Sequence, residues 1–446
     1  MGIIPLSSLE QFFRRGALPI AAVDAHAIFP STMPMRQILP LKNRIQSYDW
    51  GSRTAIPELL GQSPTGSPQA ELWMGDHPKA PSDAWVDGRW RSLESLVREH
   101  PQALLGAADD GGGDPRLPFL LKVLAAERAL SIQAHPDRPQ AVAGFDREEA
   151  AGIHRWAADR NYRDRNHKPE ILYALGPFWM MRGFRPVDDI RALTTRLGIS
   201  EDSPFDVERP SDLRRLLDGL LRLDVDTAGD LVDRVLGRLP SESEAGGDPL
   251  AGPAFQWMER LGRQYPRDRG VLAPLFLQVL RLEAGQAMFT GAGVLHAYLD
   301  GTGIELMASS DNVVRGALTG KHVDPDELMS ILRFEPADPE PLRPRQPSQG
   351  VTRFETPADF ALSVLTVEKG SPTVGRATTE GEGGSVEVLL CVDGAGEILV
   401  DDTSGDAAAP VPYRRGDSFL VPAAVPGYRF EGSGRFFRAE SRPPRA

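Results

Sequence analysis

Cysteine is almost absent from this sequence of 446 residues, which contains only Cys391. A single cysteine cannot form an intramolecular disulfide, and it excludes a metal site built from several thiolates. The scarcity of cysteine is typical of a protein in a reducing compartment, and we expect a cytoplasmic location.

Long hydrophobic runs and an excess of positive charge are missing as well. No stretch approaches the roughly 18 apolar residues of a membrane-spanning helix. The formal net charge is -12, so the chain as a whole does not attract nucleic acid or an anionic membrane, and we expect neither as a partner. Any anionic ligand must therefore be bound by a local group of cations.

The first 34 residues differ from the rest of the sequence. They contain Arg14, Arg15 and a short apolar stretch at 17–23 that Pro19 interrupts. This stretch makes a poor signal peptide because it is short and weakly hydrophobic. Met35, which precedes alternating apolar and polar residues, is a natural start. We interpret residues 1–34 as a poorly ordered N-terminal extension.

What the chain does contain is many short strand-like segments and one helical stretch. Strand patterns occur between 37 and 183 and again after 271, for example at 117–125, 129–135, 276–282, 287–290, 294–298 and 303–307. Apolar residues three or four apart predict helices at 188–197, 211–223, 227–239 and 253–265. The leucines at 213, 216, 217 and 220 form a stripe that we assign to core packing.

These patterns predict a mainly β chain built from cupin or jelly-roll barrels with an inserted helical domain. Residues 35–185 and 271–335 form a discontinuous catalytic barrel, 186–270 the helical insertion and 336–446 a second, C-terminal barrel. A proline-rich connector at 335–350 marks the last boundary. The glycine-rich segment 109–114 lacks the Gly-Lys-Ser/Thr ending of a phosphate-binding loop, so we interpret it as a surface turn.

Histidine is the first guide to chemistry, since there are only eight. Gln133 and His135 lie two apart on a predicted strand, point to the same face and can reach one ion. Taken alone, a histidine at a strand end such as His135 is more often a core residue with its hydrogen bonds satisfied than a metal ligand. Four other histidines lack such spacing, and we interpret them as structural or surface residues: His26, His77, His100 and His154.

Polar residues also crowd the start of one apolar strand. Residues 166–170 provide an amide, a base, a cation and a carboxylate, in which Lys168 and Glu170 share a face. A buried Lys–Glu ion pair is the alternative explanation. His296 lies in an apolar run and would be costly to bury without a partner. Together, His135, Glu170 and His296 form a set that suits a divalent metal such as zinc, with an open coordination position.

The strongest motif runs from Gly303 to Lys321 and reads GIELMASSDNVVRGALTGK. It resembles the signature region of type I mannose-6-phosphate isomerases, which are cupin-fold zinc enzymes that interconvert mannose 6-phosphate and fructose 6-phosphate. Further matches lie at 48–52, 70–75, 117–135, 163–170 and 296–298, in the order found in the family. The sequence departs from the family at Ala317 and Gly320, where glycine and proline are usual.

The resemblance implies that one zinc ion is bound by Gln133, His135, Glu170 and His296, and that Arg315 is the cation at the reacting end of the sugar. It also implies that further residues line the substrate pocket: Trp50, Ser131, Lys168, Tyr298, Glu305, Asp311 and Lys321.

Glu305, Lys168 and His135 are the titratable candidates for the general base, and we favour Lys168 or Glu305. The phosphate needs a local cation, for which Arg315, Lys321 and Lys122 are candidates, although Lys122 is equally well explained as a solvated strand residue. The implied role is to supply mannose for GDP-mannose and glycan synthesis, or to catabolise it. We expect a monomer or a weak homo-oligomer. A cupin-type metal oxygenase and a non-catalytic sugar-binding cupin are the alternatives.

Overall fold

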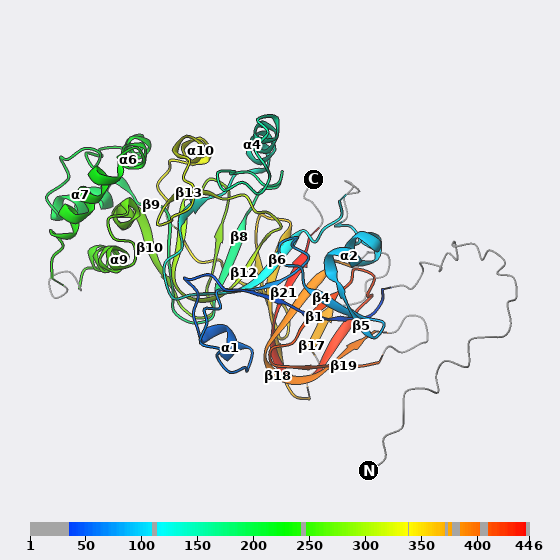
Figure 1. Ribbon diagram of the computed structural model, residues 1–446. Helices are drawn as coiled ribbons and strands as arrows, with labels where there is room; N and C mark the ends of the chain where they lie inside the picture. Colours follow the sequence, from blue (N-terminus) through cyan, green and yellow to red (C-terminus); the bar gives the residue numbers. More distant parts are fainter. Residues whose placement is uncertain are drawn as a thin grey trace, which may run out of the picture. The chain divides into compact units, whose positions relative to one another are not determined.

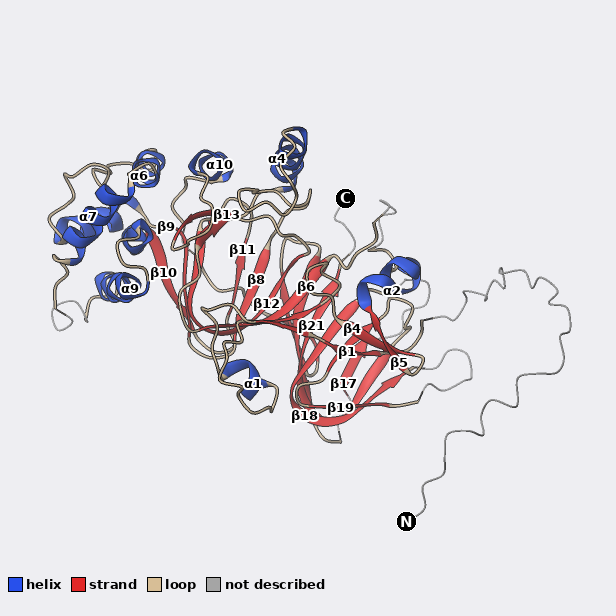
Figure 2. Ribbon diagram, in the orientation of Figure 1, coloured by secondary structure: helices blue, strands red, loops and turns tan. Residues whose placement is uncertain are grey.

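The computed structural model describes residues 35–108, 114–241, 247–337, 339–370, 373–376, 384–401 and 409–442. The predicted extension 1–34 and most of the glycine-rich segment, 109–113, lie outside the described residues. Within the unit from Met35 to Ala446, most described elements are antiparallel strands (Figures 1 and 2). The prediction of a mainly β chain is confirmed. Among the described helices, none combines the length and apolarity needed to cross a membrane.

One sheet contains the strands that carry the candidate metal ligands. Its main path runs through β10 (Leu277–Leu282), β9 (Phe178–Phe184), β12 (His296–Ala308), β6 (Phe119–Ala126), β3 (Glu71–Met74) and β2 (Arg44–Gln46). Off this path, β8 (Glu170–Ala174) pairs with β12 and β11 (Ala287–Thr290), and β7 (Ile132–Ala134) pairs with β12 and β13 (Val314–Ala317).

The second sheet is formed mainly by the C-terminal segment. Its path is β14 (Arg345–Ser348), β15 (Val351–Glu355), β16 (Phe360–Val367), β21 (Tyr428–Ser441), β18 (Glu387–Val400), β20 (Ser418–Val421), β1 (Leu39–Lys42), β4 (Asp83–Val86) and β5 (Arg89–Ser92). Outside this path, β17 (Thr373–Arg376) pairs with β21 and β19 (Val411–Arg414) with β18. Because β1, β4 and β5 extend the C-terminal sheet, strand pairing crosses the expected boundary near 335. The division into domains stays a prediction.

The two sheets pack on one another through β8. Glu170 at its start faces the candidate metal site, whereas Tyr173 faces the C-terminal sheet and contacts the rings of Phe354 and Phe437 at 5.5 and 5.0 Å. The Arg435 side chain also donates a hydrogen bond to the Tyr173 hydroxyl at 2.6 Å. A strand covered on both faces is apolar throughout rather than alternating, which explains the continuous run that follows Glu170.

The long strand β12 replaces two separate predicted strands, 294–298 and 303–307. Its first part pairs with β7 and β9, and its second with β6 and β8. The change of partners occurs at Gly301, whose φ of +129° and close approach to the backbone of Pro177 and Phe178 exclude a side chain. Because the chain bends at Gly301, the single strand β12 contains both the candidate ligand His296 and the buried Glu305.

The helical insertion lies between β9 and β10, which pair directly with each other. It contains α5 (Val187–Arg196), α6 (Asp212–Leu221), α7 (Val225–Leu236), α9 (Ala251–Gln264) and the 3-10 helix η1 (Arg269–Leu275). All four predicted helices are confirmed within three residues at either end. The leucine stripe of α6 is buried in the core of this segment, as expected. Figure 1 shows α6, α7 and α9 grouped beside β9 and β10.

Helices also occur where the sequence suggested only strands and turns. They are α1 (Ala55–Leu59), α2 (Leu93–Glu99), α3 (Pro101–Leu105) and α4 (Arg138–Ala150), and a further helix, α10 (Pro325–Ile331), follows β13. The expectation of strands alone between 37 and 183 was therefore wrong. A capping box starts α4: Asp137 accepts a hydrogen bond from the Gln140 backbone, and the Gln140 side chain accepts one from the Asp137 backbone.

A buried carboxyl group lies just after β3. Asp76 is 1% exposed; its Oδ2 accepts a hydrogen bond from the Leu117 backbone at 2.9 Å, while its Oδ1 is buried without a hydrogen-bond partner. Burial raises the pKa of Asp76 to about 7, although the Leu117 bond and the charge of Arg116 act in the opposite direction. The charged form is therefore costly in the folded chain.

Replacing Asp76 with asparagine is expected to stabilise the fold above pH 7 by about 2 kcal/mol, after allowing for a buried amide without a partner. The folded pKa lies above the unfolded value, so the wild-type chain loses stability relative to the variant as the pH rises from about 4 to 7. Urea unfolding at pH 5 and pH 8 measures this difference. Asp87→Asn, at an exposed turn, is the control and should show no such pH dependence.

Candidate active site

Three buried side chains converge where three strands begin or end. His135 follows β7, Glu170 begins β8 and His296 begins β12. Their ligand atoms all lie within 4.8 Å of one another. Glu170 approaches both rings, with Oε1 at 3.3 Å from Nε2 of His135 and Oε2 at 3.4 Å from Nε2 of His296. None of the three residues is more than 2% exposed.

The hydrogen bonds of the two rings show that this cluster fits a cation. Nδ1 of His135 lies 2.8 Å from the Asn312 carbonyl, and Nδ1 of His296 lies 2.9 Å from the Val294 carbonyl. A carbonyl only accepts, so each ring carries its proton on Nδ1 and turns the lone pair of Nε2 toward Glu170. Oε2 of Glu170 and Nε2 of His296 are buried without hydrogen-bond partners. A divalent ion would satisfy these facing lone pairs.

Gln133 is brought to the same place by strand register. On β7 it is paired directly with His296 of β12 on one side and with Arg315 of β13 on the other. Directly paired residues of antiparallel strands point to the same face, so the three side chains lie on one side of the sheet. Ser131 donates a hydrogen bond to Oε1 of Gln133 at 3.3 Å. The role of Gln133 as fourth ligand stays a prediction.

Lys168 lies against the ligands themselves. Its Nζ is 2.5 Å from Oε1 of Glu170 and 3.4 Å from Nε2 of His135. The Lys168–Glu170 ion pair anticipated as the alternative explanation is thus present within the metal-ligand cluster. Burial and the charge of Lys168 lower the pKa of His135 to about 4, against the attraction of Glu170, so this imidazole is neutral as a ligand must be.

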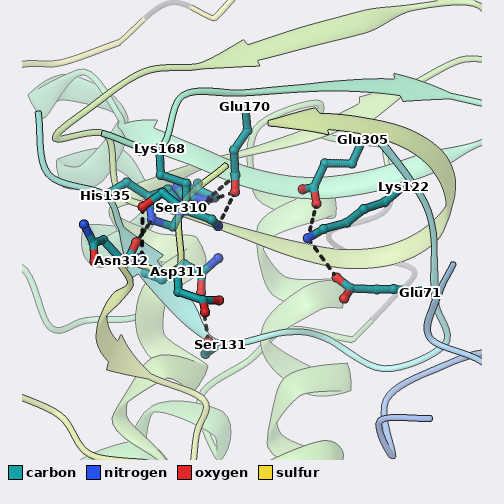
Figure 3. Close-up of polar contacts among 12 residues, drawn as sticks. Glu71, Lys122, Ser131, His135, Lys168, Glu170, Glu305, Ser310, Asp311 and Asn312 are labelled. Atoms are coloured by element: carbon teal, nitrogen blue, oxygen red, sulfur yellow. Dashed lines mark hydrogen bonds and ion pairs between the residues drawn. The ribbon is translucent and has the colours of Figure 1, made fainter. Parts of the chain in front are cut away.

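A second buried charge cluster lies beside the first (Figure 3). Nζ of Lys122 is 2.9 Å from Oε2 of Glu305 and 3.5 Å from Oε1 of Glu71. Trp73 Nε1 donates a hydrogen bond to Glu71 at 2.8 Å. Lys122 is only 6% exposed, so the alternative of a solvated strand residue is wrong.

Opposing effects set the protonation of this second cluster. Burial opposes the charge of Lys122, but the attraction of Glu305 and Glu71 outweighs burial and raises its pKa. For Glu305, burial raises the pKa and Lys122 only partly opposes the rise. Tyr298, 4% exposed, has its pKa raised by burial and by the charge of Glu305. A lysine that stays charged beside a carboxyl group of raised pKa suits proton transfer.

The remaining predicted residues are less buried than the two clusters, since Trp50, Ser131, Asp311 and Arg315 are half-buried and Lys321 is exposed; we call this set the rim. Trp50 stacks on Tyr48 with ring centroids 5.6 Å apart, and Nζ of Lys321 lies 6.0 Å from the centre of the Tyr48 ring. Burial, followed by the charge of Arg163, lowers the pKa of Arg315 from its usual value. Arg163 therefore lies close enough to Arg315 for the two guanidinium charges to repel each other.

Asp311 is held at this rim by residues that the sequence analysis missed. Its Oδ2 lies 2.8 Å from Nζ of Lys79 and 3.6 Å from Nε2 of His77. His77 is 4% exposed and also contacts the edge of the Trp73 ring. His77 and Lys79 lie in the turn that follows β3, where the Ala80 backbone N–H donates a hydrogen bond to the His77 carbonyl, and no local sequence pattern marks them as site residues.

Comparison with known proteins gives a consistent result. Residues 38–187 match the family described as phosphomannose isomerase type I, catalytic domain. The chain is 35% identical to mannose-6-phosphate isomerase of Escherichia coli strain K12 over 407 residues, which cover 90% of this chain and 99% of the relative. The Bos taurus mannose-6-phosphate isomerase is 32% identical, with 88% and 95% of the two chains covered.

Solved structures agree with these relatives. A zinc-bound mannose 6-phosphate isomerase has a TM-score of 0.79 and 34% sequence identity, over 91% of this chain and 99% of that one. A lysine-to-alanine mutant of phosphomannose isomerase from Salmonella typhimurium has the same TM-score, identity and coverage. With identity above 30% over nearly the full length of these relatives, and with the expected ligand residues gathered at one site, this chain belongs to the type I mannose-6-phosphate isomerase family.

Proposed function

We propose that this chain interconverts mannose 6-phosphate and fructose 6-phosphate with one zinc ion, held by Gln133, His135, Glu170 and His296. The observation that carries the proposal is the register of β7, in which Gln133 pairs with His296 on one side and with Arg315 on the other, next to the cluster of His135, Glu170 and His296 that could hold an ion. A relative matched over 99% of its length is named mannose-6-phosphate isomerase, which supports mannose 6-phosphate as one substrate. Fructose 6-phosphate as the other is what the family resemblance implies.

The reaction moves a carbonyl group between C1 and C2 of the open-chain sugar. A base removes the proton from the carbon beside the carbonyl, an enediol forms, and the proton returns to the neighbouring carbon while the hydroxyl proton shifts between the two oxygens. Negative charge develops on those oxygens, and fixed cations in a site that excludes water stabilise it strongly. Bound zinc would supply Lewis-acid polarisation of the sugar oxygens.

The chain's own residues divide the remaining tasks. Arg315 lies beside the ligands and offers a planar pair of donors to the developing charge. Glu305 and Lys168 remain the candidate bases, and the raised pKa of Glu305 brings its proton affinity closer to that of the reacting carbon. Lys321 provides a cation for the phosphate at the rim, with Tyr48 and Trp50 beside it. Ser131, Tyr298 and Asp311 complete the proposed pocket.

The closing test is an isomerase assay in both directions. Zinc-loaded protein should convert mannose 6-phosphate to fructose 6-phosphate without consuming oxygen, and a chelator should abolish the reaction. Oxygen uptake would favour the metal oxygenase, whereas sugar-phosphate binding without turnover would favour a sugar-binding cupin. Either result would overturn the isomerase.

Replacing Arg315 with alanine is expected to retain zinc and lower kcat about a hundredfold, close to 2.7 kcal/mol of lost transition-state stabilisation. The loss falls on kcat because the charge appears only as the reaction proceeds. Steady-state kinetics with metal analysis measures both quantities. Arg36→Ala, an exposed arginine, is the matched control. Wild-type turnover in Arg315→Ala would remove this residue from the mechanism.

The same proposal covers the partners, the cellular location and the metabolic role of the enzyme. The substrate is a small sugar phosphate, and the acidic chain has no nucleic-acid or membrane partner. We place it in the cytoplasm, as a monomer or weak homo-oligomer, supplying mannose for GDP-mannose and glycan synthesis or for catabolism.

A further inference from the structure

Asn312 is a buried residue beside the site to which neither the sequence motifs nor the proposed mechanism gives a task. It is fully buried, at 0% exposure, on the segment between β12 and β13. Figure 3 shows it beside His135 and Asp311. We infer that Asn312 is a positioning residue that ties His135 to the segment leading into Glu170 and thereby slows release of the metal, an inference that rests on the proposed zinc site.

The first tie is made by the backbone of Asn312. Its carbonyl oxygen accepts the Nδ1–H of His135 at 2.8 Å. This bond selects the tautomer with a free lone pair on Nε2, which faces Glu170. It also fixes the rotation of the imidazole, since a ring held at Nδ1 can turn only by breaking that bond.

The second tie is made by the side-chain amide. Its Oδ1 accepts hydrogen bonds from the backbone N–H groups of Arg163 and Asp164 at 2.7 and 3.2 Å. Its Nδ2 donates to the carbonyls of Asp164 and Asn166 at 2.8 and 2.9 Å. A single amide therefore holds the turn 163–166, which continues through Lys168 to the ligand Glu170.

Asparagine suits this position because the turn presents both donors and acceptors. An amide offers an acceptor oxygen and two N–H donors, which these four backbone groups use. Alanine would leave the four groups buried without their partner. Aspartate has the same shape, but its second oxygen would face the carbonyls of Asp164 and Asn166 and Oδ1 of Asp164, which is 3.2 Å from Nδ2 in the wild type.

The consequence concerns metal retention rather than chemistry. Two ligands from distant parts of the chain share one support, so loosening the turn displaces Glu170 relative to His135. Loss of such a supporting residue typically lowers metal affinity 10- to 100-fold. We expect Asn312→Ala and Asn312→Asp to release zinc about 10 to 100 times faster than the wild type.

The test measures zinc release from the full-length holoenzyme to a chromophoric chelator, well below the unfolding temperature. The visible absorption of the cobalt(II)-substituted protein is recorded as a second readout, because a change in ligand geometry alters it whereas a loss of stability alone does not. Asn161→Ala is the matched control: this buried asparagine precedes the turn 163–166, and its side-chain amide donates to Asp324 at 3.0 Å, away from His135 and Glu170.

The inference is supported if the Asn312 variants, but not Asn161→Ala, release zinc faster and change the cobalt spectrum. It is overturned if zinc release from a folded Asn312 variant stays within twofold of the wild type. If Asn312→Ala does not fold, the isosteric Asn312→Asp decides the question. A wild-type chain that binds no stoichiometric zinc would instead overturn the proposed metal site, so the two failures are distinguishable.

Discussion

The His296→Ala variant is expected to lose both bound zinc and isomerase activity, with turnover falling by at least about a thousandfold, since a catalytic metal supplies several kcal/mol of charge stabilisation. His296 contributes one of the three clustered ligand atoms, and its Nε2 has no other hydrogen-bond partner. Without it, the ion pairs that Glu170 forms in the described part of the chain are those with His135 and Lys168. Two remaining protein ligands with a weak amide are too few for tight zinc binding.

Metal content after dialysis, measured together with kcat, checks this expectation. His154→Ala is the matched control because it removes an exposed histidine from the same chain. Excess zinc should restore part of the activity of His296→Ala if the residue acts through the ion alone. One tightly bound zinc per chain and normal turnover in this variant would show that the metal is held elsewhere.

The metal-binding part of the site could be predicted from the sequence because its polar and charged residues occur in or beside apolar segments. A histidine in an apolar run and a lysine and carboxylate at the mouth of an apolar strand need compensation when buried. That reasoning identified Glu170 and His296 without any knowledge of pairing, and the strand spacing of Gln133 and His135 added His135. The same spacing was the only physical argument for Gln133, which joined the ligand set mainly through the family resemblance, since the sequence does not show that β7 lies between β12 and β13.

The missed residues depend on loops that are distant in the sequence. His77 and Lys79 are more than 230 positions away in the sequence from Asp311, which they contact. The partners of Asn312 are backbone groups, which every residue possesses and which therefore leave no mark in the sequence. Local patterns carry no information about such contacts. The pairing of β1 with β20, between residues near 40 and near 420, was hidden for the same reason.

Helices could be predicted from the sequence where the buried residues recur every three or four positions. The insertion helices each bury one side, and their apolar spacing revealed them. Helix α4 buries only Ala141, Gly144 and Glu148, so it has no apolar stripe, and only its capping box distinguishes it from a loop.

The Lys122→Met variant is expected to lose about 3–5 kcal/mol of unfolding free energy at pH 8, because it leaves Glu305 and Glu71 buried without their shared cation. Methionine fills a similar volume, so the cost reflects lost charge compensation rather than a cavity. The cost should be smaller at pH 5.5. Burial already raises the pKa of Glu305, and removal of Lys122 raises it further, so the variant takes up a proton as the pH falls.

The direction of this pH dependence follows from linkage. A carboxyl group with a folded pKa above its unfolded value loses stability as the pH rises between the two values. The deficit of Lys122→Met should therefore grow from pH 5.5 to pH 8, as measured by urea unfolding of zinc-saturated protein. Lys42→Met, at an exposed strand end, is the control and should show little change at either pH.

A double variant separates charge from packing in the same cluster. Adding Glu305→Gln to Lys122→Met removes the uncompensated carboxylate, so the double variant should be more stable than Lys122→Met at pH 8 and should respond less to pH. Equal deficits at both pH values, with no recovery in the double variant, would show that Lys122 contributes by packing against Trp73, whose ring centre lies 5.3 Å from its Nζ. Recovery would show that the folded chain tolerates this pair of buried carboxylates only because Lys122 remains charged between them.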